Sequence, residues 1–369
     1  MTILRHFTPR VTPTPSVTGV GPVLEVRNLK THFQTERGMV HAVDGVSLTA
    51  EPGKVVGIVG ESGSGKTVLA RSIMGLLPRQ GVFRSGEVLL AGRTISGLPE
   101  SELRAIRGLE IGMVFQDSMS SLNPVVKIGR QITEGLEYHK GMHTAEARRL
   151  SLALLKSVEV PDPERRLDEY PHQLSGGMRQ RVAIAMALAC EPKVLLADEP
   201  TTALDVTVQA HVLDLLKDLQ EDRAMAMILV THDLGVVATR ADEIVVMYAG
   251  QVVERAPTRV LFREMQMPYT QALLRSVPRI DGPRHATFVT IGGRPPDLTN
   301  PPPGCRFAPR CSRAQDRCRS EDPPLTAGRT IGHEFACWFP LGVGSPSREA
   351  PLTPTPTPTV GPSAERREF

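Results

Sequence analysis

The chain has 369 residues, of which 40% are hydrophobic and 22% are charged, as in a globular protein that buries a sizeable core. Its 43 basic and 40 acidic residues nearly balance, so the net charge of +3 gives no support to nucleic-acid binding. No apolar run is long enough to span a membrane, and Thr and Pro stand near the N-terminus where a signal peptide has an apolar core. We therefore expect a cytosolic protein, in which any membrane role must come through a partner.

Both ends of the chain are rich in Thr and Pro. Residues 1–21 and 344–369 carry too little apolar sequence to order themselves, and we predict two disordered tails. Between the tails, short apolar runs alternate with helix-length segments; the runs are Val55–Val59, Val194–Ala197, Met227–Val230 and Ile244–Met247. This alternation predicts an α/β core with a mainly parallel sheet.

Residues 127–170 interrupt this alternation. Apolar residues recur there at helical spacing with no strand between them, namely Ile128, Ile132, Leu136, Leu150, Leu154, Leu155 and Val158. We interpret the region, about residues 125–180, as a helical subdomain inserted in the α/β core. The strand pattern ends after Val253, and a Pro-rich stretch over 278–303 leads into a cluster of cysteines.

A glycine-rich loop follows the strand predicted at Val55–Val59. It consists of Gly60, Glu61, Ser62, Gly63, Ser64, Gly65, Lys66 and Thr67. A strand before the loop and a helix after it are the context of a Walker A phosphate loop, and they argue against a glycine turn that matches by coincidence. Backbone N–H groups would surround the β-phosphate at the start of the helix. Lys66 is expected to contact the β- and γ-phosphates, and the Thr67 hydroxyl to ligate Mg²⁺.

Polar residues also follow three later strands. Asp198 and Glu199 end one apolar run, while Gln116 and His232 each follow another. The carboxyl ends of parallel strands share the edge of the sheet where ligands bind. We assign Asp198 to Mg²⁺ and Glu199 to the water that attacks the γ-phosphate. A lone Gln or His after a strand is usually a surface residue, but at this edge Gln116 would contact Mg²⁺ or the water, and His232 the γ-phosphate.

A series of motifs in a fixed order supports a family resemblance. In chain order they are GESGSGKT at 60–67, Gln116, LSGGM at 174–178, LLADE at 195–199, Ala203-Leu204-Asp205 and His232. Over about residues 22–256 this series resembles the nucleotide-binding subunit of ABC transporters, a P-loop ATPase fold. The resemblance implies that Glu199 is the catalytic base, that Gln116 belongs to the Q-loop and that His232 is the switch histidine.

The same resemblance implies further contacts with ATP. The residues concerned are Ser175, Gly176 and Gly177 of the signature motif, Asp205 of the D-loop, and Phe33 as the residue that stacks on adenine. The signature usually ends in Gln rather than Met178, which leaves the expected phosphate contacts unchanged. In this family the signature motif completes the nucleotide site of the opposing subunit, so two cassettes are expected to bind two ATP molecules head to tail.

Four of the five cysteines lie within 33 residues near the C-terminus. They are Cys305, Cys311, Cys318 and Cys337; Cys190 stands apart and is expected to be simply packed. In a reducing compartment such a cluster indicates a metal before a disulfide. Residues 257–343 resemble the C-terminal extension of oligopeptide and dipeptide importer ATPases, and this resemblance implies a structural [4Fe–4S] cluster. The alternatives are Zn²⁺, held by four thiolates or with His333 in place of one, and cysteines without a metal.

Together the two resemblances imply an ATPase that powers import of dipeptides or oligopeptides across the cytoplasmic membrane. The implied partners are a second, paralogous ATPase subunit, two transmembrane permeases and an extracytoplasmic peptide-binding protein, with no nucleic acid. The chain would lie at the cytoplasmic face of the inner membrane as a peripheral subunit. The rival functions are a soluble ABC ATPase in translation or DNA repair, an importer ATPase for nickel or another peptide-like solute, and a redox or iron sensor.

Overall fold

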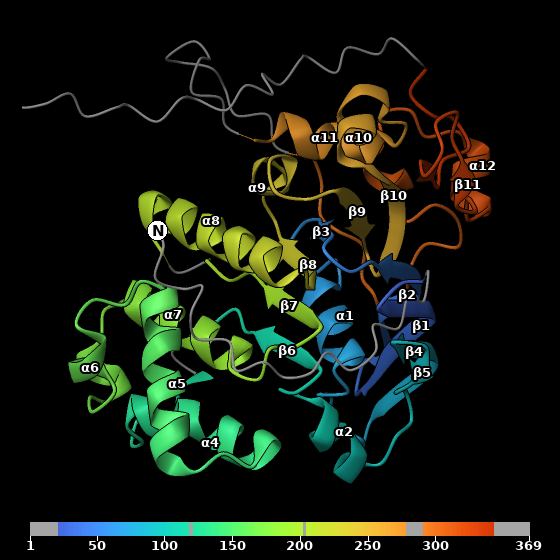
Figure 1. Cartoon of the computed structure of the whole chain (residues 1–369). Helices are drawn as coiled ribbons and strands as arrows, with labels where there is room; N and C mark the ends of the chain where they lie inside the picture. Colours follow the sequence, from blue (N-terminus) through green and yellow to red (C-terminus); the bar gives the residue numbers. More distant parts are fainter. Residues whose placement is uncertain (1–20, 118–120, 202–203, 278–290, 343–369) are drawn as a thin grey trace, which may run out of the picture.

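The computed structural model describes residues 21–117, 121–201, 204–277 and 291–342, and Figure 1 shows how its elements are arranged. The strands are β1 Leu24–Thr35, β2 Gly38–Ala50, β3 Val55–Val59, β4 Val82–Leu90, β5 Arg93–Thr94, β6 Ile111–Val114, β7 Val194–Asp198, β8 Ala226–Thr231, β9 Glu243–Tyr248, β10 Gln251–Pro257, β11 Thr326–Ala327 and β12 Glu334–Phe335. The helices are α1 Lys66–Ile73, α2 Glu100–Ile106, α4 Ile128–Lys140, α5 Thr144–Ser157, α6 Pro163–Arg166, α7 Gly176–Leu188, α8 Val206–Arg223, α9 Leu234–Ala238, α10 Thr258–Glu264, α11 Pro268–Arg275 and α12 Asp316–Ser320, with 3₁₀ turns η2 Pro171–Gln173 and η3 Ala308–Arg310. The predicted tails, residue Ala203 and part of the Pro-rich stretch lie outside the described residues.

The larger sheet has the strand order β11-β12-β10-β9-β3-β8-β7-β6. Its strands β9, β3, β8, β7 and β6 run parallel, so the predicted α/β core with a mainly parallel sheet is confirmed. The expectation that strands end after Val253 is wrong, because β10 runs on to Pro257 and pairs with β12 far along the chain. Two-residue strands such as β12 carry no periodicity that a sequence pattern could reveal.

A second, antiparallel sheet with the order β2-β1-β4-β5 covers one face of the larger sheet, together with α1. No sequence pattern above predicts it. The alternation within β3 explains why both faces of the larger sheet are covered: Val55 and Val59 belong to one apolar cluster, Val56 and Ile58 to the other. All five residues of β3 are buried, as in parallel strands covered on both faces.

The helices between β6 and β7 gather beside β6, at the opposite end of the larger sheet from α10, α11 and α12 (Figure 1). The apolar residues with helical spacing lie on α4 and α5, apart from Val158, which directly follows α5; Ile128, Ile132, Leu136, Leu154, Leu155 and Val158 are buried. Cys190 follows α7 and is buried, as expected. Of the helices in the described ranges, none combines the length and the apolar character needed to cross a membrane.

Candidate nucleotide site and cysteine-lined pocket

The phosphate loop fills the short distance between β3 and α1, and two of its glycines are required by close packing. A Cβ atom on Gly60 would lie 2.2 Å from the Met247 carbonyl oxygen of β9. A Cβ atom on Gly65 would lie 2.1 Å from the Ala42 carbonyl oxygen of β2, and the φ of Gly65 is +101°. Only glycine fits such positions. The loop is therefore held closely between β2 and β9.

Lys66 is folded back into this loop. Its side chain is 4% exposed, and its Nζ donates to the carbonyl oxygens of Gly60 (2.8 Å) and Glu61 (3.0 Å). Burial lowers the pKa of Lys66, because the charged form loses water, while the carboxylates of Glu199 and Asp198 oppose that shift. The amine thus holds two bonds that phosphate oxygens could replace.

Asp198 ends β7 and is fully buried. Its Oδ1 accepts a hydrogen bond from the Thr67 hydroxyl (3.1 Å), whereas its buried Oδ2 has no partner among the described residues. Burial raises the pKa of Asp198, although the Thr67 hydrogen bond opposes this. A hydroxyl oxygen next to a carboxylate oxygen that lacks a partner is a donor set suited to Mg²⁺, which prefers hard oxygen ligands.

Glu199 contacts the other two side chains predicted at this edge, Gln116 and His232. Its Oε2 accepts from Gln116 Nε2 at 3.2 Å and lies 3.3 Å from His232 Nδ1. The backbone of Glu199 has a φ of +44°, which is uncommon for a residue other than glycine and typical of functional sites. Its N–H donates to the Val230 carbonyl on β8. The structure therefore brings Gln116 and His232 to Glu199, and within the described ranges no hydrogen bond joins Gln116 to Thr67 or Asp198.

The signature and D-loop residues begin helices away from this edge. Ser175 is the N-cap of α7, where its Oγ accepts from the Met178 N–H (3.3 Å), and Ser175 and Gly176 are exposed. Asp205 is the exposed N-cap of α8 and accepts from the Val208 N–H (3.0 Å). Within the described ranges, no hydrogen bond of Ser175 or Asp205 reaches the phosphate loop. The N-terminal end of α7 thus begins at the surface, at Ser175 and Gly176.

Phe33 lies on β1, opposite Val40 of β2 and Val82 of β4, and is half-buried. The structure gives it no ring partner among the described residues. Because successive side chains of a strand point to opposite faces, its neighbour on β1 faces the other way.

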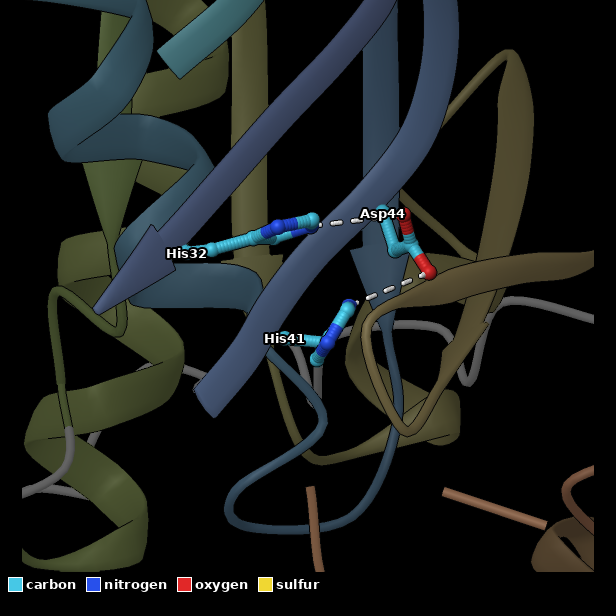
Figure 2. Close-up of side chains that lie close together, drawn as sticks. All are labelled: His32, His41 and Asp44. Carbon is cyan, nitrogen blue, oxygen red and sulfur yellow. Dashed lines mark ion pairs between the residues drawn. The ribbon is translucent and has the colours of Figure 1, made fainter. Parts of the chain in front are cut away.

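That neighbour, His32, belongs to a cluster that the sequence reasoning missed. Figure 2 shows His32 and His41 beside Asp44, with the two rings 4.1 Å apart. His32 Nε2 lies 3.3 Å from Asp44 Oδ1, and His41 Nδ1 lies 3.8 Å from Asp44 Oδ2. Arg306 and Lys30 also pair with Asp44, so its charge is already balanced. The cluster therefore joins β1 and β2 to the cysteine-bearing segment, and we assign it no metal.

The four clustered cysteines line one pocket. Its walls also include Met267, Phe307, Trp338 and Phe339. Burial raises the pKa of Cys305 and of Cys337 to about 11 and also raises that of Cys311. Backbone N–H groups oppose these shifts: those of Phe307 and Ala308 at Cys305, that of Arg313 at Cys311 and that of Phe339 at Cys337. Partly buried thiols whose sulfurs accept from backbone N–H groups suit thiolate ligation of a metal.

Two observations bear on the choice between an iron–sulfur cluster and Zn²⁺ at this pocket. His333 donates to or accepts from Glu254 Oε1 at 2.9 Å in a fully buried pair and does not line the pocket. The alternative in which His333 replaces a cysteine is therefore wrong. Thiolates at 2.3 Å from one Zn²⁺ lie about 3.8 Å apart. In the described part of the chain, no three cysteine sulfurs lie within 4.8 Å of one another.

Comparisons with known proteins match two separate regions of the chain. The ABC transporter family matches residues 43–202, and the oligopeptide/dipeptide transporter C-terminal region matches residues 253–318. The oligopeptide transport ATP-binding protein AppD of Bacillus subtilis is 50% identical over 313 residues, which cover 84% of this chain and 95% of AppD. The dipeptide transport ATP-binding protein DppD of the same organism is 49% identical over 318 residues, which cover 86% of this chain and 94% of DppD.

Solved structures share the cassette. A dimeric post-hydrolysis state of the ATP-binding cassette MJ0796, bound to ADP and Pi, matches with a TM-score of 0.58 and 32% identity over 64% of this chain and 99% of that chain. CbiO1 from Clostridium perfringens, part of the ABC transporter complex cbiONQ, matches with a TM-score of 0.55 and 30% identity over 66% of this chain and 92% of that chain. The chain belongs to the ABC transporter ATP-binding proteins that carry the oligopeptide/dipeptide transporter C-terminal region.

Proposed function

We propose that this chain is the ATP-hydrolysing subunit that powers import of dipeptides or oligopeptides through partner permeases. The observation that carries the ATPase half is the meeting of Lys66, the Thr67–Asp198 pair and Glu199 at one edge of the sheet. The C-terminal region that it shares with AppD and DppD supports the peptide half. The division into a cassette over 22–256 and an extension over 257–343 is part of this proposal.

ATP binding uses the whole loop from Gly60 to Thr67. Lys66 exchanges its bonds to the Gly60 and Glu61 carbonyls for the β- and γ-phosphates. Thr67 and Asp198 would hold Mg²⁺, and the metal would supply positive charge that neutralises the phosphates. Phe33 stacks on the adenine.

Hydrolysis centres on Glu199. Its carboxylate takes a proton from a water as the water oxygen attacks the γ-phosphorus and the bond to the β-phosphate oxygen breaks, which yields ADP and phosphate. Gln116 and His232 hold one oxygen of this carboxylate, so they orient the base. Gln116 additionally contacts the attacking water or Mg²⁺, and His232 the γ-phosphate.

A second cassette completes the site. Ser175, Gly176 and Gly177, at the N-terminal end of α7, bind the ATP held by the opposing subunit, since a helix N-terminus favours anions; Ser175 and Gly176 are exposed and Gly177 is partly buried. Asp205 lies at the same interface. The opposing subunit is a paralogue, and the helical subdomain over 125–180 docks on the permeases at the cytoplasmic face of the membrane. An extracytoplasmic protein delivers the peptide.

The cysteine-lined pocket holds a structural [4Fe–4S] cluster through Cys305, Cys311, Cys318 and Cys337. The four cysteines that line the pocket are the ligand set of such a cluster, and among the described residues no three of their sulfurs lie as close together as a single Zn²⁺ would hold them. Burial raises the pKa of Cys305, Cys311 and Cys337, so without a metal these thiols stay protonated, and a bound cluster would take the place of their protons.

Peptide uptake tests the transport function. A strain that lacks this gene is given a radiolabelled dipeptide, a radiolabelled pentapeptide or radioactive nickel, and uptake is measured with wild-type or Lys66→Ala protein restored. We expect peptide uptake to depend on the wild-type protein and to stay absent with Lys66→Ala. Loss of nickel uptake alone, or purification with ribosomes or DNA ends instead of permeases, would replace the proposal with one of its rivals.

The exposed signature motif gives a separate test of the two-cassette arrangement. In a Glu199→Gln background, ATP should drive association of cassettes, alone or mixed with the paralogue, as measured by size-exclusion chromatography. Ser175→Arg should abolish that association and leave ATP binding to the single chain unchanged. Ser101→Arg, at an exposed position of α2, is the matched control. Association that survives Ser175→Arg would refute the arrangement.

A further inference from the structure

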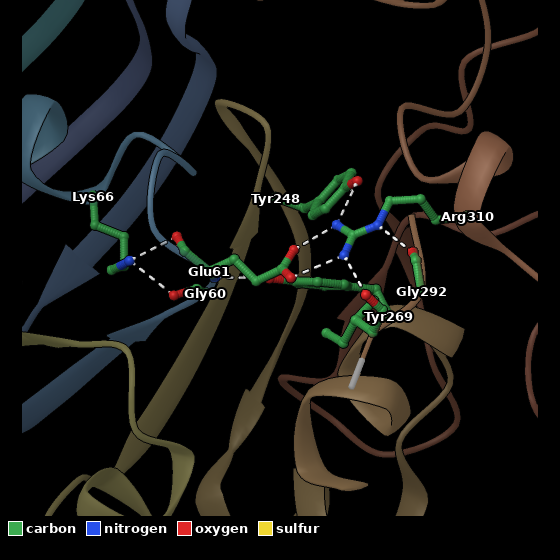
Figure 3. A network of polar contacts seen from close by, with 8 residues as sticks. Gly60, Glu61, Lys66, Tyr248, Tyr269, Gly292 and Arg310 are labelled. Carbon is green, nitrogen blue, oxygen red and sulfur yellow. Dashed lines mark hydrogen bonds and ion pairs between the residues drawn. The ribbon is translucent and has the colours of Figure 1, made fainter. Parts of the chain in front are cut away.

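Arg310 uses every N–H group of its guanidinium although it lies between two regions of the chain. Its side chain is 3% exposed. Two donors form a fork on the Glu61 carboxylate, at 2.6 Å and 3.0 Å. The other three reach the Tyr248 hydroxyl (3.2 Å) and the carbonyl oxygens of Gly292 (2.8 Å) and Ile291 (3.0 Å), and Figure 3 shows this network. A planar fork with all donors engaged fixes both the position and the direction of its carboxylate partner.

Glu61 carries this contact directly into the phosphate loop. Its carbonyl oxygen accepts from Lys66 Nζ (3.0 Å), and its N–H donates to the buried Tyr269 hydroxyl (2.9 Å) (Figure 3). Its backbone and its side chain are therefore held at the same time, the side chain by Arg310. Displacement of the Glu61 carboxylate would move a carbonyl group that now positions Lys66.

The other end of the network lies in the wall of the cysteine-lined pocket. Arg310 is the last residue of η3 and directly precedes Cys311. Phe307, at the start of the same turn, lines the pocket and packs edge-on against Tyr248 and Tyr269, with ring centroids 5.3 Å apart in both cases. A shift of the segment from Cys305 to Cys311, which contains η3, would thus move Arg310 through the backbone and through the packing of these rings.

We propose that Arg310 is a positioning residue of the ATP site: by clamping Glu61 it keeps the phosphate loop shaped for ATP, and the packing of the cysteine-lined pocket sets how firmly it does so. The link from Arg310 to the loop rests on contacts in the structure alone. The dependence of that link on a bound metal rests on the proposed function. The tests below therefore treat the two parts separately.

The first test measures ATP affinity by equilibrium titration in a Glu199→Gln background, well below the melting temperature of each variant. Arg310→Met should weaken ATP binding about tenfold, since it leaves the Glu61 carboxylate without its partner. Arg310→Lys should recover part of this loss, because it restores the charge but not the fork. Arg319→Met, an exposed arginine of the same segment, is the matched control and should bind ATP normally. Unchanged affinity in Arg310→Met would overturn the proposal.

Glu61→Gln keeps the test decisive if Arg310→Met folds poorly. The substitution is isosteric at a partly exposed side chain, and it should weaken ATP binding in the same direction. In the double variant the two losses should not add, because both break one contact. Fully additive losses, or an effect on melting temperature alone, would show that Arg310 acts as a structural contact and not through the loop.

The second test perturbs the pocket in the full chain. Cys311→Ser should weaken ATP binding, with little further loss in the Arg310→Met, Cys311→Ser double variant. Iron and zinc content and the visible absorption spectrum are recorded on the same samples. If no metal is found yet Cys311→Ser still weakens ATP binding through Arg310, the metal proposal fails and the coupling stands. If metal is present and its loss leaves ATP affinity unchanged, the coupling to the pocket fails and the metal proposal stands.

Discussion

The phosphate edge and the cysteine-lined pocket are built in opposite ways. At the edge, Asp198, Glu199 and His232 lie at or just beyond the ends of neighbouring parallel strands, so the hydrogen bonds of the sheet fix where their side chains begin. The pocket is formed mostly by short turns and irregular chain, with the three-residue turn η3, the five-residue helix α12 and the first residue of α11, Pro268, as its regular elements. The first site is organised by the backbone before any ligand arrives, whereas the second, under the proposed function, would depend on the cluster that its cysteines hold.

The largest effect should come from the edge. Glu199→Gln should lower ATP hydrolysis by about 10³-fold, because the amide cannot accept the proton of the attacking water. ATP binding should persist, since Lys66, Thr67 and Asp198 are unchanged. Phosphate release in the presence of the partner cassette measures the first effect, and Glu191→Gln at an exposed position is the control. Near-normal ATP turnover in Glu199→Gln would contradict the role of Glu199 as the catalytic base, and with it the difference between a catalytic edge and a structural pocket.

The pocket should respond in stability and metal content. Cys318→Ser should release the metal and lower the free energy of unfolding by about 2 kcal/mol or more, because few regular elements hold this segment without it. Iron analysis and thermal unfolding measure the two changes. Cys190→Ala should keep the metal, since Cys190 lies outside the pocket. A Cys318→Ser protein with full metal content and unchanged melting would show that the pocket is organised like the edge, without a ligand.

A substitution of Asp198 tests whether this buried carboxylate lowers the free energy of unfolding of the metal-free protein. Burial raises the pKa of this carboxyl above its unfolded value, so wild-type protein without Mg²⁺ loses stability as the pH rises above about 4. Asp198→Asn should therefore stabilise the metal-free protein at pH 7 by about 1 kcal/mol, and this gain should shrink as the pH falls toward 4. Urea unfolding measures the gain, with Asp218→Asn at an exposed position of α8 as the control. A destabilised Asp198→Asn protein would contradict the expected sign.

The smallest effect concerns the junction formed by His32, His41 and Asp44, which joins β1 and β2 to the cysteine-bearing segment. Burial lowers the pKa of His41, with contributions from His32, Arg306 and Lys30, while Asp44 opposes the shift. Folding then favours neutral His41, so its contribution to stability is complete above about pH 6.5 and declines as the pH falls. The change should stay below about 0.5 kcal/mol, because solvent reaches this site.

Urea unfolding of His41→Gln across that pH range measures this contribution. The variant should show a flatter dependence of stability on pH than the wild type, and His143→Gln at an exposed position should match the wild type. An unchanged slope in His41→Gln would show that the junction does not respond to pH.

The sequence predicted those features whose signal lies within a short stretch of chain, and missed those that join distant residues. The four apolar runs correspond to β3, β7, β8 and β9, because a fully buried strand leaves a continuous local signal. The antiparallel sheet of β1, β2, β4 and β5 had no comparable signal in the patterns considered. Arg310 and Glu61 are 249 positions apart, and the pair of His333 with Glu254 spans 79, so neither could be read from local spacing. A lone arginine beside a cysteine offers no pattern at all.

By itself, the sequence determined the α/β cassette and which residues stand at strand ends, because strand periodicity and glycine-rich turns are local properties of the chain. Only the tertiary structure decided that Gln116 and His232 meet on Glu199, that Asp198 Oδ2 has no partner among the described residues and that Arg310 pairs with Glu61 of the phosphate loop. These contacts join segments that are distant in sequence. Their geometry depends on how the buried faces of the sheet pack, and no single segment contains that information.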